Sequence, residues 1–234
     1  GNFKSMKAFV ITLFNDKYSL ASAENTLKTA RQMNDDLHIE MVRAVTPDKI
    51  KDSTYSYPKE GETSTYEGMT LTGYKAKDIG KKVACSLSHM HLWNKCVEMN
   101  EPIMILEHDA VFTRKFRLGK LLDAIEDGDI VMINDPRGAT RRGTIYHENI
   151  IRWDKGLNTI DGVNTPDENV PDGLAGNSAY IITPAAAKKA SELQSSIGIW
   201  PNDALLCKQL FPRNLKSYYP YITRVEQKKS TTTG

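Results

Sequence analysis

The sequence predicts an α/β fold in which helices cover both faces of a mostly parallel central sheet. Short apolar segments rich in β-branched residues alternate along the chain with longer segments of helical period, and this alternation is typical of parallel sheets. The segments at 102–106 and 129–133 are almost wholly apolar, as expected of strands that are buried on both faces. A length of 234 residues suits a single domain, which we place at 6–226.

The first expected element is a buried strand at 7–13, which ends at the turn formers Asn15 and Asp16. A helix is expected at 22–33, because its apolar residues recur at helical spacing, and a strand at 39–45. The later elements, in chain order, are expected at 81–99 (helix), 102–106 (strand), 116–126 (helix), 129–133 and 178–183 (strands), 184–193 and 202–210 (helices) and 217–225 (strand).

Two long polar stretches, 49–80 and 134–173, carry no usable period. A stretch of this length inside a domain is either a functional loop or lid, or an irregular but packed excursion. The helix expected at 81–99 is apolar nearly all round, which predicts that it is buried. Residues 1–5 are interpreted as a cloning remnant and 227–234 as a flexible tail.

The composition excludes several classes of protein. Hydrophobic residues make up 40% of the chain and charged residues 26%, which is too apolar for a disordered chain and too charged for a membrane protein. Apolar runs stay far below the roughly 20 residues of a membrane span. The three cysteines are widely spaced and odd in number, so we expect reduced thiols and a cytoplasmic location rather than a disulfide framework. A net charge of +2 argues against wholesale coating of nucleic acid.

An acidic pair follows the expected strand at 102–106. Successive strand residues point to opposite faces, so Glu107 and Asp109 are expected to project one way and His108 the other. Two carboxylates at the carboxyl end of a buried strand form a hard-oxygen site for Mn²⁺ or Mg²⁺, and such an ion holds a diphosphate. The alternative is that the pair caps the next turn or meets a nearby cation.

A polar couple lies on the helix that precedes this strand. Ser86 and His89 are three residues apart and share a face of an otherwise apolar helix. One interpretation is a binding site beside the acidic pair. The other is a buried histidine hydrogen-bonded to the serine.

The order of these segments resembles glycosyltransferase family 25, which includes the bacterial lipooligosaccharide β-galactosyltransferases and the procollagen galactosyltransferases. The most specific part is a Ser-Leu-Ser-His-x-x-x-Trp helix followed by an acidic triplet. The matching segments are Ala8–Leu13, Val42–Val45, Cys85–Trp93, Ile105–Ala110, Ala175–Ile182 with Ala185–Lys189, and Pro201–Asp203.

The resemblance implies a GT-A-like fold and inverting transfer of a hexosyl or pentosyl group from a nucleotide-diphosphate sugar, with a UDP-sugar favoured. It also implies a DXD-type site in which Glu107 and Asp109 hold the metal. Two positions depart from the family: His108 replaces the usual central acid, and the loop at 15–19 lacks the usual arginine. The donor-binding residues expected on this basis are Thr12, Leu13, Asn15, Ser86, Ser88, His89, Glu107, His108 and Asp109.

Inverting transfer is a single displacement, so it needs a general base for the acceptor hydroxyl and no protein nucleophile. Asp203 is the preferred base, because it matches a late aspartate of the family; otherwise it is an ordinary acid in the first turn of a helix. Asp172 is the second candidate, since neighbouring glycines allow a substrate to approach closely. The expected acceptor-binding residues are Gly176, Asn177, Ser178 and Trp200.

The acceptor itself stays open at this point. A glycan is the favoured acceptor, and a hydroxymethylated base in DNA is the alternative. DNA is considered because arginines gather at 137–152 and further lysines and arginines lie near the C-terminus, where they could contact phosphates. Two other classes of function compete with sugar transfer. A metal-dependent phosphoesterase would use Glu107 and Asp109 but normally needs further metal-ligand spacings. A non-catalytic nucleic-acid-binding module would use the arginines.

Overall fold

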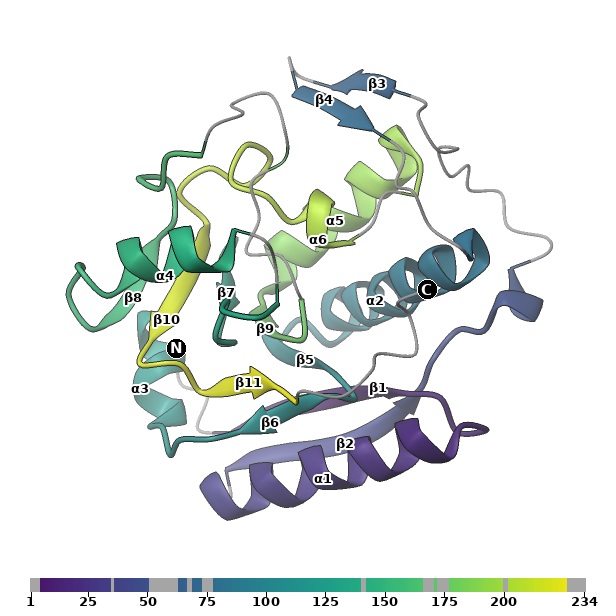
Figure 1. Ribbon diagram of the computed structural model, residues 1–234, viewed down its shortest axis with the longest axis horizontal. Coiled ribbons are helices and arrows are strands. Elements are labelled where there is room, and N and C mark those ends of the chain that lie inside the picture. Colours follow the sequence, from purple (N-terminus) through teal and green to yellow (C-terminus); the bar gives the residue numbers. More distant parts are fainter. Residues whose placement is uncertain are drawn as a thin grey trace.

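The computed structural model describes residues 5–34, 36–50, 63–66, 69–72, 78–139, 142–165, 171, 177–199 and 202–226. Its centre is a seven-stranded sheet with the strand order β2-β1-β5-β9-β7-β10-β8 (Figure 1). The strands are β1 (Met6–Thr12), β2 (Leu37–Arg43), β5 (Ile103–Glu107), β7 (Ile130–Met132), β8 (Gly156–Thr159), β9 (Ala179–Ile182) and β10 (Leu215–Tyr219).

Most strands of this sheet run in one direction. β1 is parallel to β2 and β5, and β7 is parallel to β10. β9 is antiparallel to both β5 and β7, and β8 is antiparallel to β10. Five of the seven strands (β2, β1, β5, β7 and β10) therefore share one direction, which confirms the predicted α/β fold. The reversed β9 has a local consequence: its amino end lies beside the carboxyl end of β5.

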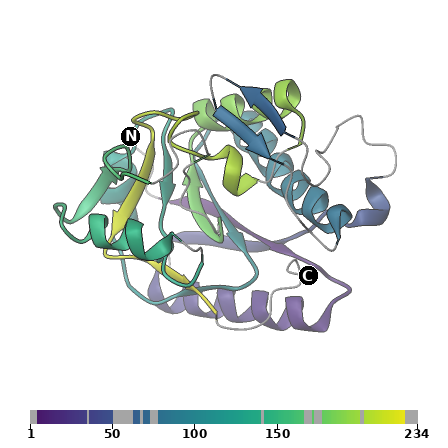
Figure 2. The same cartoon turned by 45° about the horizontal axis from the view of Figure 1, so that its top comes forward.

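Helices cover both faces of the sheet. Figures 1 and 2 show α1 on one side, and α2 and α5 on the other. The helices are α1 (Lys17–Met33), α2 (Ile79–Met99), α3 (Leu118–Ala124), α4 (Gly143–Ile150), α5 (Pro184–Ile197) and α6 (Asn202–Leu205). A 3₁₀ turn spans Pro47–Lys49, and two small antiparallel pairs join β3 (Thr63–Tyr66) to β4 (Met69–Thr72) and β6 (Ala110–Phe112) to β11 (Thr223–Val225). Among the helices that can be described, none is both long and apolar enough to cross a membrane.

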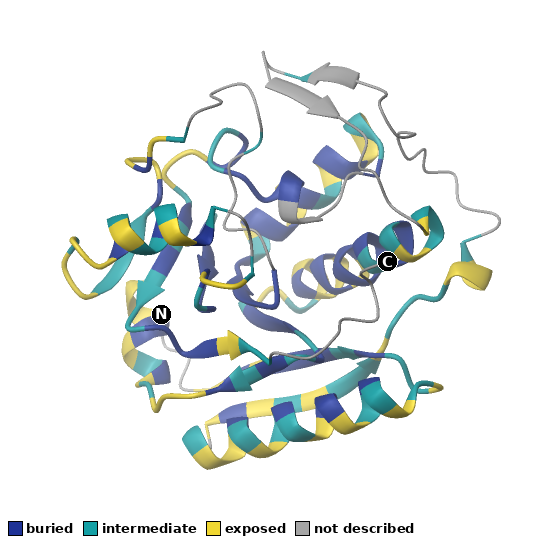
Figure 3. Ribbon diagram, viewed as in Figure 1, coloured by how far each residue is buried: buried dark blue, intermediate teal, exposed yellow. Residues whose placement is uncertain are grey.

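The central strands divide the apolar core into two layers, because neighbouring side chains of a strand point to opposite faces. β5, β7 and β9 are buried along nearly their whole length, as Figure 3 shows. The layer that includes α2 and α5 takes Phe9, Ile103, Ile105, Ile130, Tyr180 and Ile182 from the strands. The layer that includes α1 and α3 takes Ala8, Val10, Met104, Leu106, Val131 and Ile181. Glu107 continues the odd-numbered series of β5 and therefore faces α2.

Several element boundaries differ from the predicted ones. α1 begins five residues before the predicted start, because Asp16 caps it by accepting a hydrogen bond from the Ser19 amide (2.8 Å). α5 continues to Ile197, and α6 ends at Leu205 rather than at 210. The strand predicted at 217–225 is two strands, β10 and β11. Pro220 lies between them and has no backbone N–H for a sheet.

The two polar stretches hold elements that the prediction missed. The first contains β3 and β4, and the second contains α4 and β8. β8 is an edge strand whose four residues are all half-buried, so no alternation marks it. α4 has eight residues and buries only Gly143, Tyr146 and Ile150, which is too few to reveal a helical period.

A buried hydroxyl group of α1 holds the backbone of the turn that follows β5. Thr26 Oγ1 lies 2.6 Å from the carbonyl oxygen of Ala110, 3.0 Å from that of His108 and 3.1 Å from that of Ser22. Its single proton is shared among these three acceptors, and the side chain is fully buried. The carbonyl groups on both sides of Asp109 are therefore held against α1.

Replacing Thr26 with valine keeps the β-branched shape and removes this hydrogen bond. We expect a loss of about 1–3 kcal/mol in the free energy of unfolding, because buried carbonyl groups of the turn lose their donor. Urea denaturation followed by circular dichroism measures it. Thr144→Val, at an exposed position of α4, is the matched control, and equal losses in the two variants would contradict this account.

Candidate active site

A cavity of about 190 Å³ lies over the carboxyl ends of three neighbouring strands. Leu13 follows β1, Ala44 and Val45 follow β2, and Glu107 ends β5; all four line the cavity. The early turns of α2 close another side. Ligands of open α/β sheets gather at this edge. Ligand pockets usually have about 300–1,000 Å³, so the described walls enclose room for only part of a typical ligand.

A larger, more open hollow of about 480 Å³ lies at the other end of the sheet. Lys7 and the residues at the start of β2 line it, together with Arg31. It is at the amino ends of β1 and β2, where ligands of such sheets do not gather. The smaller cavity is therefore the better candidate for the active site.

The triplet at the end of β5 sends its side chains to different helices. Glu107 faces α2, while His108 turns to α1, where its Nδ1 lies 2.9 Å from Ser19 Oγ and its ring meets Tyr18 edge-on. This agrees with the predicted alternation. His108 still lines the cavity with Glu107 and Asp109, because the cavity lies over the end of the strand. Burial lowers the pKa of His108, and this effect outweighs the negative charges of Glu107 and Asp16, which raise it. The ring is therefore neutral at pH 7.

Asp109 lies in the turn after β5, beyond the strand itself. Its Oδ1 is buried and finds no hydrogen-bond partner among the residues that the structure describes. Burial, together with the negative charges of Glu107 and Glu226, raises the pKa of Asp109 to about 7. Two carboxylates thus converge on one cavity and repel each other, which is an arrangement that a divalent cation would stabilise.

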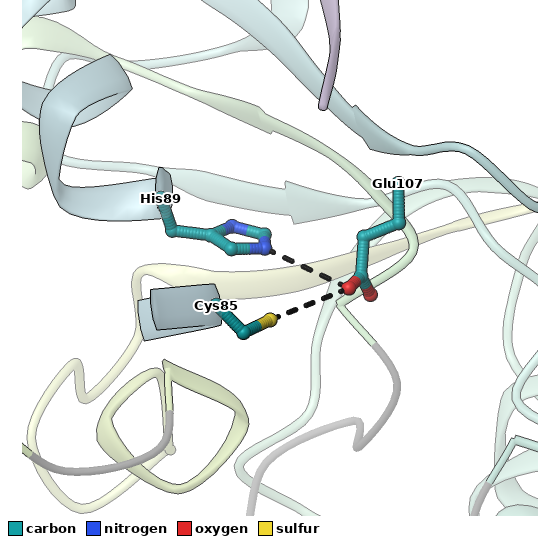
Figure 4. A group of neighbouring side chains, drawn as sticks. All are labelled: Cys85, His89 and Glu107. Carbon is teal, nitrogen blue, oxygen red and sulfur yellow. Dashed lines mark hydrogen bonds and ion pairs between the residues drawn. The ribbon is translucent and has the colours of Figure 1, made fainter. Parts of the chain in front are cut away.

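The side of Glu107 that faces α2 meets a cysteine and a histidine (Figure 4). Glu107 Oε2 lies 3.7 Å from Cys85 Sγ and 3.9 Å from His89 Nε2. His89 is fully buried, and its Nδ1 lies 2.6 Å from the hydroxyl oxygen of Tyr180. Trp93 Nε1 donates to the same oxygen (3.0 Å).

The hydrogen-bond partner of His89 differs from the predicted serine. The histidine bonds to Tyr180 of β9, while Ser86 Oγ is buried without a hydrogen-bond partner in the described part of the chain. Ser86 and His89 are neighbours on one helix face, but the sheet supplies a better-placed oxygen from 91 residues away.

Other predicted donor-binding residues hold the walls together. Ser88 lines the cavity, accepts a hydrogen bond from the Val45 amide (2.9 Å) and donates to Ala84 (2.8 Å). Thr12 is buried and donates to the carbonyl oxygen of Val10 (2.9 Å). Asn15 is exposed, outside the cavity lining. The hydroxyl groups of Ser88 and Thr12 are therefore already used in hydrogen bonds that hold the protein backbone.

The predicted acceptor-binding residues are described in part. The carbonyl oxygen of Ser178 accepts a hydrogen bond from the Glu107 amide (2.8 Å), which fixes the start of β9 beside the acidic pair. Asn177 is buried, and neither its Oδ1 nor its Nδ2 finds a partner among the described atoms. Gly176, Trp200 and the candidate base Asp172 lie outside the described residues, and Asp203 is placed by its backbone alone, in α6.

Three residues with ionisable side chains line the cavity although the prediction did not assign them to the site: Asp16, Lys81 and Cys85. The sequence identifies Asp16 only as a turn former, although it also caps α1. Lys81 lies exposed in the first turn of α2 and brings a positive charge to the rim. Cys85 belongs to the most recognisable helix of the sequence, but nothing in its spacing shows that it would meet Glu107.

A family model described as "Glycosyltransferase family 25 (LPS biosynthesis protein)" matches residues 6–206. A comparison with curated proteins gives no match.

Similar solved structures include the galactosyltransferase LgtC in complex with donor and acceptor sugar analogues (11% identity, TM-score 0.44, 91% of this chain and 73% of that one). Mouse xyloside xylosyltransferase 1 in its apo form is similar at 10% identity and TM-score 0.43, over 90% and 83% of the two chains. The bifunctional glycosyltransferase WbbM in its apo structure is similar at 10% identity and TM-score 0.47, over 94% and 40%.

The raised pKa of Asp109 predicts how stability depends on pH. In metal-free protein the folded chain keeps this proton up to about pH 7, whereas the unfolded chain releases it near the ordinary aspartate pKa of 3.8. Between these values the folded state binds more protons, so the free energy of unfolding falls as the pH rises. Asp109→Asn removes the titrating group, so this fall in the free energy of unfolding should be absent from the variant. In the presence of a chelator we expect the variant to gain on the order of 2 kcal/mol relative to wild type between pH 5 and pH 8.

Urea denaturation at the two pH values measures this gain. Asp154→Asn, at an exposed position, is the control and should follow the wild type at both. A gain of Asp109→Asn that is the same at pH 5 and pH 8 would show that Asp109 is already ionised in the folded protein at pH 5.

Proposed function

The chain belongs to glycosyltransferase family 25, and we propose that it moves a sugar from a nucleotide-diphosphate sugar, with a UDP-sugar favoured, to an acceptor hydroxyl with inversion at the anomeric carbon. Membership of the family favours sugar transfer over a phosphoesterase and over a non-catalytic nucleic-acid-binding module. The observation that carries the proposal is the pair Glu107 and Asp109, which share one cavity at the carboxyl ends of β1, β2 and β5. The α/β sheet and the family together support a GT-A-like assignment.

The residues of the cavity fit a hard divalent cation, Mn²⁺ or Mg²⁺. Asp109 Oδ1 is a buried oxygen that lacks a donor among the described residues, and its pKa is raised partly by the charge of Glu107. Such oxygens are the ligands that both ions prefer. Glu107 and Asp109 would hold the ion, which when bound neutralises charge on the departing diphosphate.

The remaining chemistry belongs to the chain. The acceptor oxygen forms a bond to the anomeric carbon while the bond from that carbon to the diphosphate breaks on the opposite face. A carboxylate must take the hydroxyl proton as this happens. We propose Asp203 for this role and Asp172 as the second candidate. Lys81 at the rim supports the binding of an anionic donor by its charge.

A glycan is the favoured acceptor. The description of the family names LPS biosynthesis, whose acceptors are glycans. Asn177 has a buried amide and directly precedes Ser178, whose carbonyl oxygen is bonded to the Glu107 amide; amides of this kind hydrogen-bond sugar hydroxyls. The case for DNA is weaker, because Arg137 is held by Asp135 through two side-chain hydrogen bonds (3.1 and 2.8 Å). We propose a cytoplasmic location, in keeping with three cysteines that no disulfide joins.

Donor turnover tests the metal pair and the base separately. We expect the wild type with Mn²⁺ to hydrolyse one UDP-sugar of a panel slowly and to transfer its sugar to a glycan. Asp109→Asn should lower kcat/KM for donor hydrolysis by about 100-fold or more, because one ligand of the cation is lost. Asp203→Asn should abolish transfer and keep Mn²⁺-dependent donor binding, measured by calorimetry. The proposal fails if no nucleotide sugar binds in the presence of Mn²⁺.

The charge of Lys81 is expected to serve donor binding rather than chemistry. Lys81→Gln should raise KM for the donor about five- to tenfold and leave kcat unchanged, as for the loss of one charge-assisted contact in a solvated site. Steady-state kinetics at two salt concentrations measure it, and the effect should shrink at high salt. Lys188→Gln, at an exposed position of α5, is the matched control. A fall in kcat at constant KM would contradict this role.

A further inference from the structure

Glu107 has a second set of neighbours, whose chemistry differs from that of Asp109. We propose that Cys85 Sγ, His89 Nε2 and the Glu107 carboxylate form a binding site for a thiophilic divalent cation, and that this cation is Zn²⁺. A thiolate, an imidazole and a carboxylate are the donor types that bind Zn²⁺ in proteins, whereas Mg²⁺ and Mn²⁺ favour oxygen.

The separations of the three donor atoms suit a tetrahedral ion. All three lie within 4.8 Å of one another, with 3.7 Å between sulfur and Oε2 and 3.9 Å between nitrogen and Oε2. Bonds of about 2.0–2.1 Å from Zn²⁺ to nitrogen or oxygen and about 2.3 Å to sulfur place tetrahedral ligands about 3.3–3.6 Å apart. The sulfur–Oε2 separation is close to this geometry, and the nitrogen–Oε2 separation would have to shorten by about half an ångström.

The backbone brings these residues together for simple reasons. Cys85 and His89 are four residues apart and share a face of α2. Glu107 belongs to the odd-numbered series of β5, which faces α2. His89 is fully buried, and its Nε2 has no hydrogen-bond partner among the described residues while it points at Glu107 (Figure 4). A buried ring nitrogen of this kind lacks a polar partner, and a bound Zn²⁺ would be one.

The surroundings of His89 provide the support that metal-binding histidines usually have. The second ring nitrogen of such a histidine usually donates a hydrogen bond to a nearby oxygen. Nδ1 of His89 lies 2.6 Å from the hydroxyl oxygen of Tyr180, which also receives the Trp93 N–H. When a cation takes the lone pair of Nε2, the ring proton lies on Nδ1, and the hydroxyl oxygen, which has two lone pairs, accepts both hydrogen bonds.

Binding at this site is expected to be reversible. The chain contributes three ligands, and Cys85 and Glu107 also line the cavity, so the fourth position of the ion opens to solvent. The Cys85 thiol loses its proton to solvent as the sulfur–zinc bond forms. These features are typical of an exchangeable site rather than of a closed structural one.

The two cation sites share Glu107. An ion held by Cys85 and His89 removes this carboxylate from the pair with Asp109, so Zn²⁺ should compete with Mn²⁺ and inhibit sugar transfer. This consequence rests on the proposed function, whereas the binding of Zn²⁺ does not. The two are therefore tested by separate measurements.

Cobalt is a spectroscopic probe for the binding site. Reduced, chelator-treated protein titrated with Co²⁺ should develop the sulfur-to-cobalt charge-transfer band of a thiolate ligand and the intense visible bands of a tetrahedral ion. One equivalent of Zn²⁺ should remove both. If wild type shows no charge-transfer band, the site does not exist, whatever the result of any sugar-transfer assay.

Variants identify the ligands. Cys85→Ser should abolish the charge-transfer band and weaken Zn²⁺ binding at least tenfold, and Glu107→Gln should weaken it while the band remains. Cys207→Ala, which removes a buried thiol elsewhere in the core, should bind as wild type does. Circular dichroism confirms that each variant is folded; we leave His89 in place because it is fully buried. A band that survives Cys85→Ser, or one lost in a folded Cys207→Ala, overturns the assignment.

Inhibition is tested at a fixed Mn²⁺ concentration with the UDP-sugar that the wild type turns over. Zn²⁺ should inhibit wild type, and at least tenfold more Zn²⁺ should be needed to inhibit Cys85→Ser. Equal inhibition of both proteins overturns the regulatory consequence and leaves the spectroscopic result to decide the binding site. If no nucleotide sugar is turned over, the proposed function fails, and the cobalt titration still decides whether the site exists.

Discussion

The organisation of this protein depends on how β5 ends. Along a strand, neighbouring side chains must point to opposite faces, and here the two faces carry different helices. Glu107 therefore reaches Cys85 and His89 of α2, while His108 reaches Ser19 of α1. The chain then turns, and Thr26 holds the turn against α1 through the carbonyl groups on both sides of Asp109. Three consecutive residues are each fixed by a different contact, and together they line one cavity.

The reversed strand β9 connects this site to the core. Because β9 is antiparallel to β5, Ser178 lies opposite Glu107 and accepts its backbone N–H. Two residues further on, Tyr180 is fully buried and binds both His89 and Trp93 through its hydroxyl group. The burial of Tyr180 raises the pKa of its hydroxyl well above the ordinary value, so it stays protonated and uncharged. The helix that carries Cys85 and His89 is thus positioned by the centre of the sheet.

The sequence was sufficient to predict the features that local pattern determines. Continuous apolar runs predicted β5 and β7, and strand alternation predicted the opposite directions of Glu107 and His108. The direction of β9 was not predictable, because an apolar run of four residues looks the same in either direction. The partner of His89 was also missed, since helical spacing reveals neighbours on one helix and says nothing about Tyr180, which approaches from another element. Long-range pairing therefore sets the limit of prediction here.

The repulsion between the carboxylates of this cavity explains why a neutral histidine suits the centre of the triplet. Asp109 already bears the repulsion of Glu107 and Glu226, which together with burial raises its pKa to about 7. A third carboxylate at position 108 would add negative charge to a cavity that has no cation in the metal-free protein, and the cost would grow with burial. His108 instead fills the position with a neutral ring bonded to Ser19. A neutral ring at this position spares the metal-free folded state the cost of a third buried carboxylate.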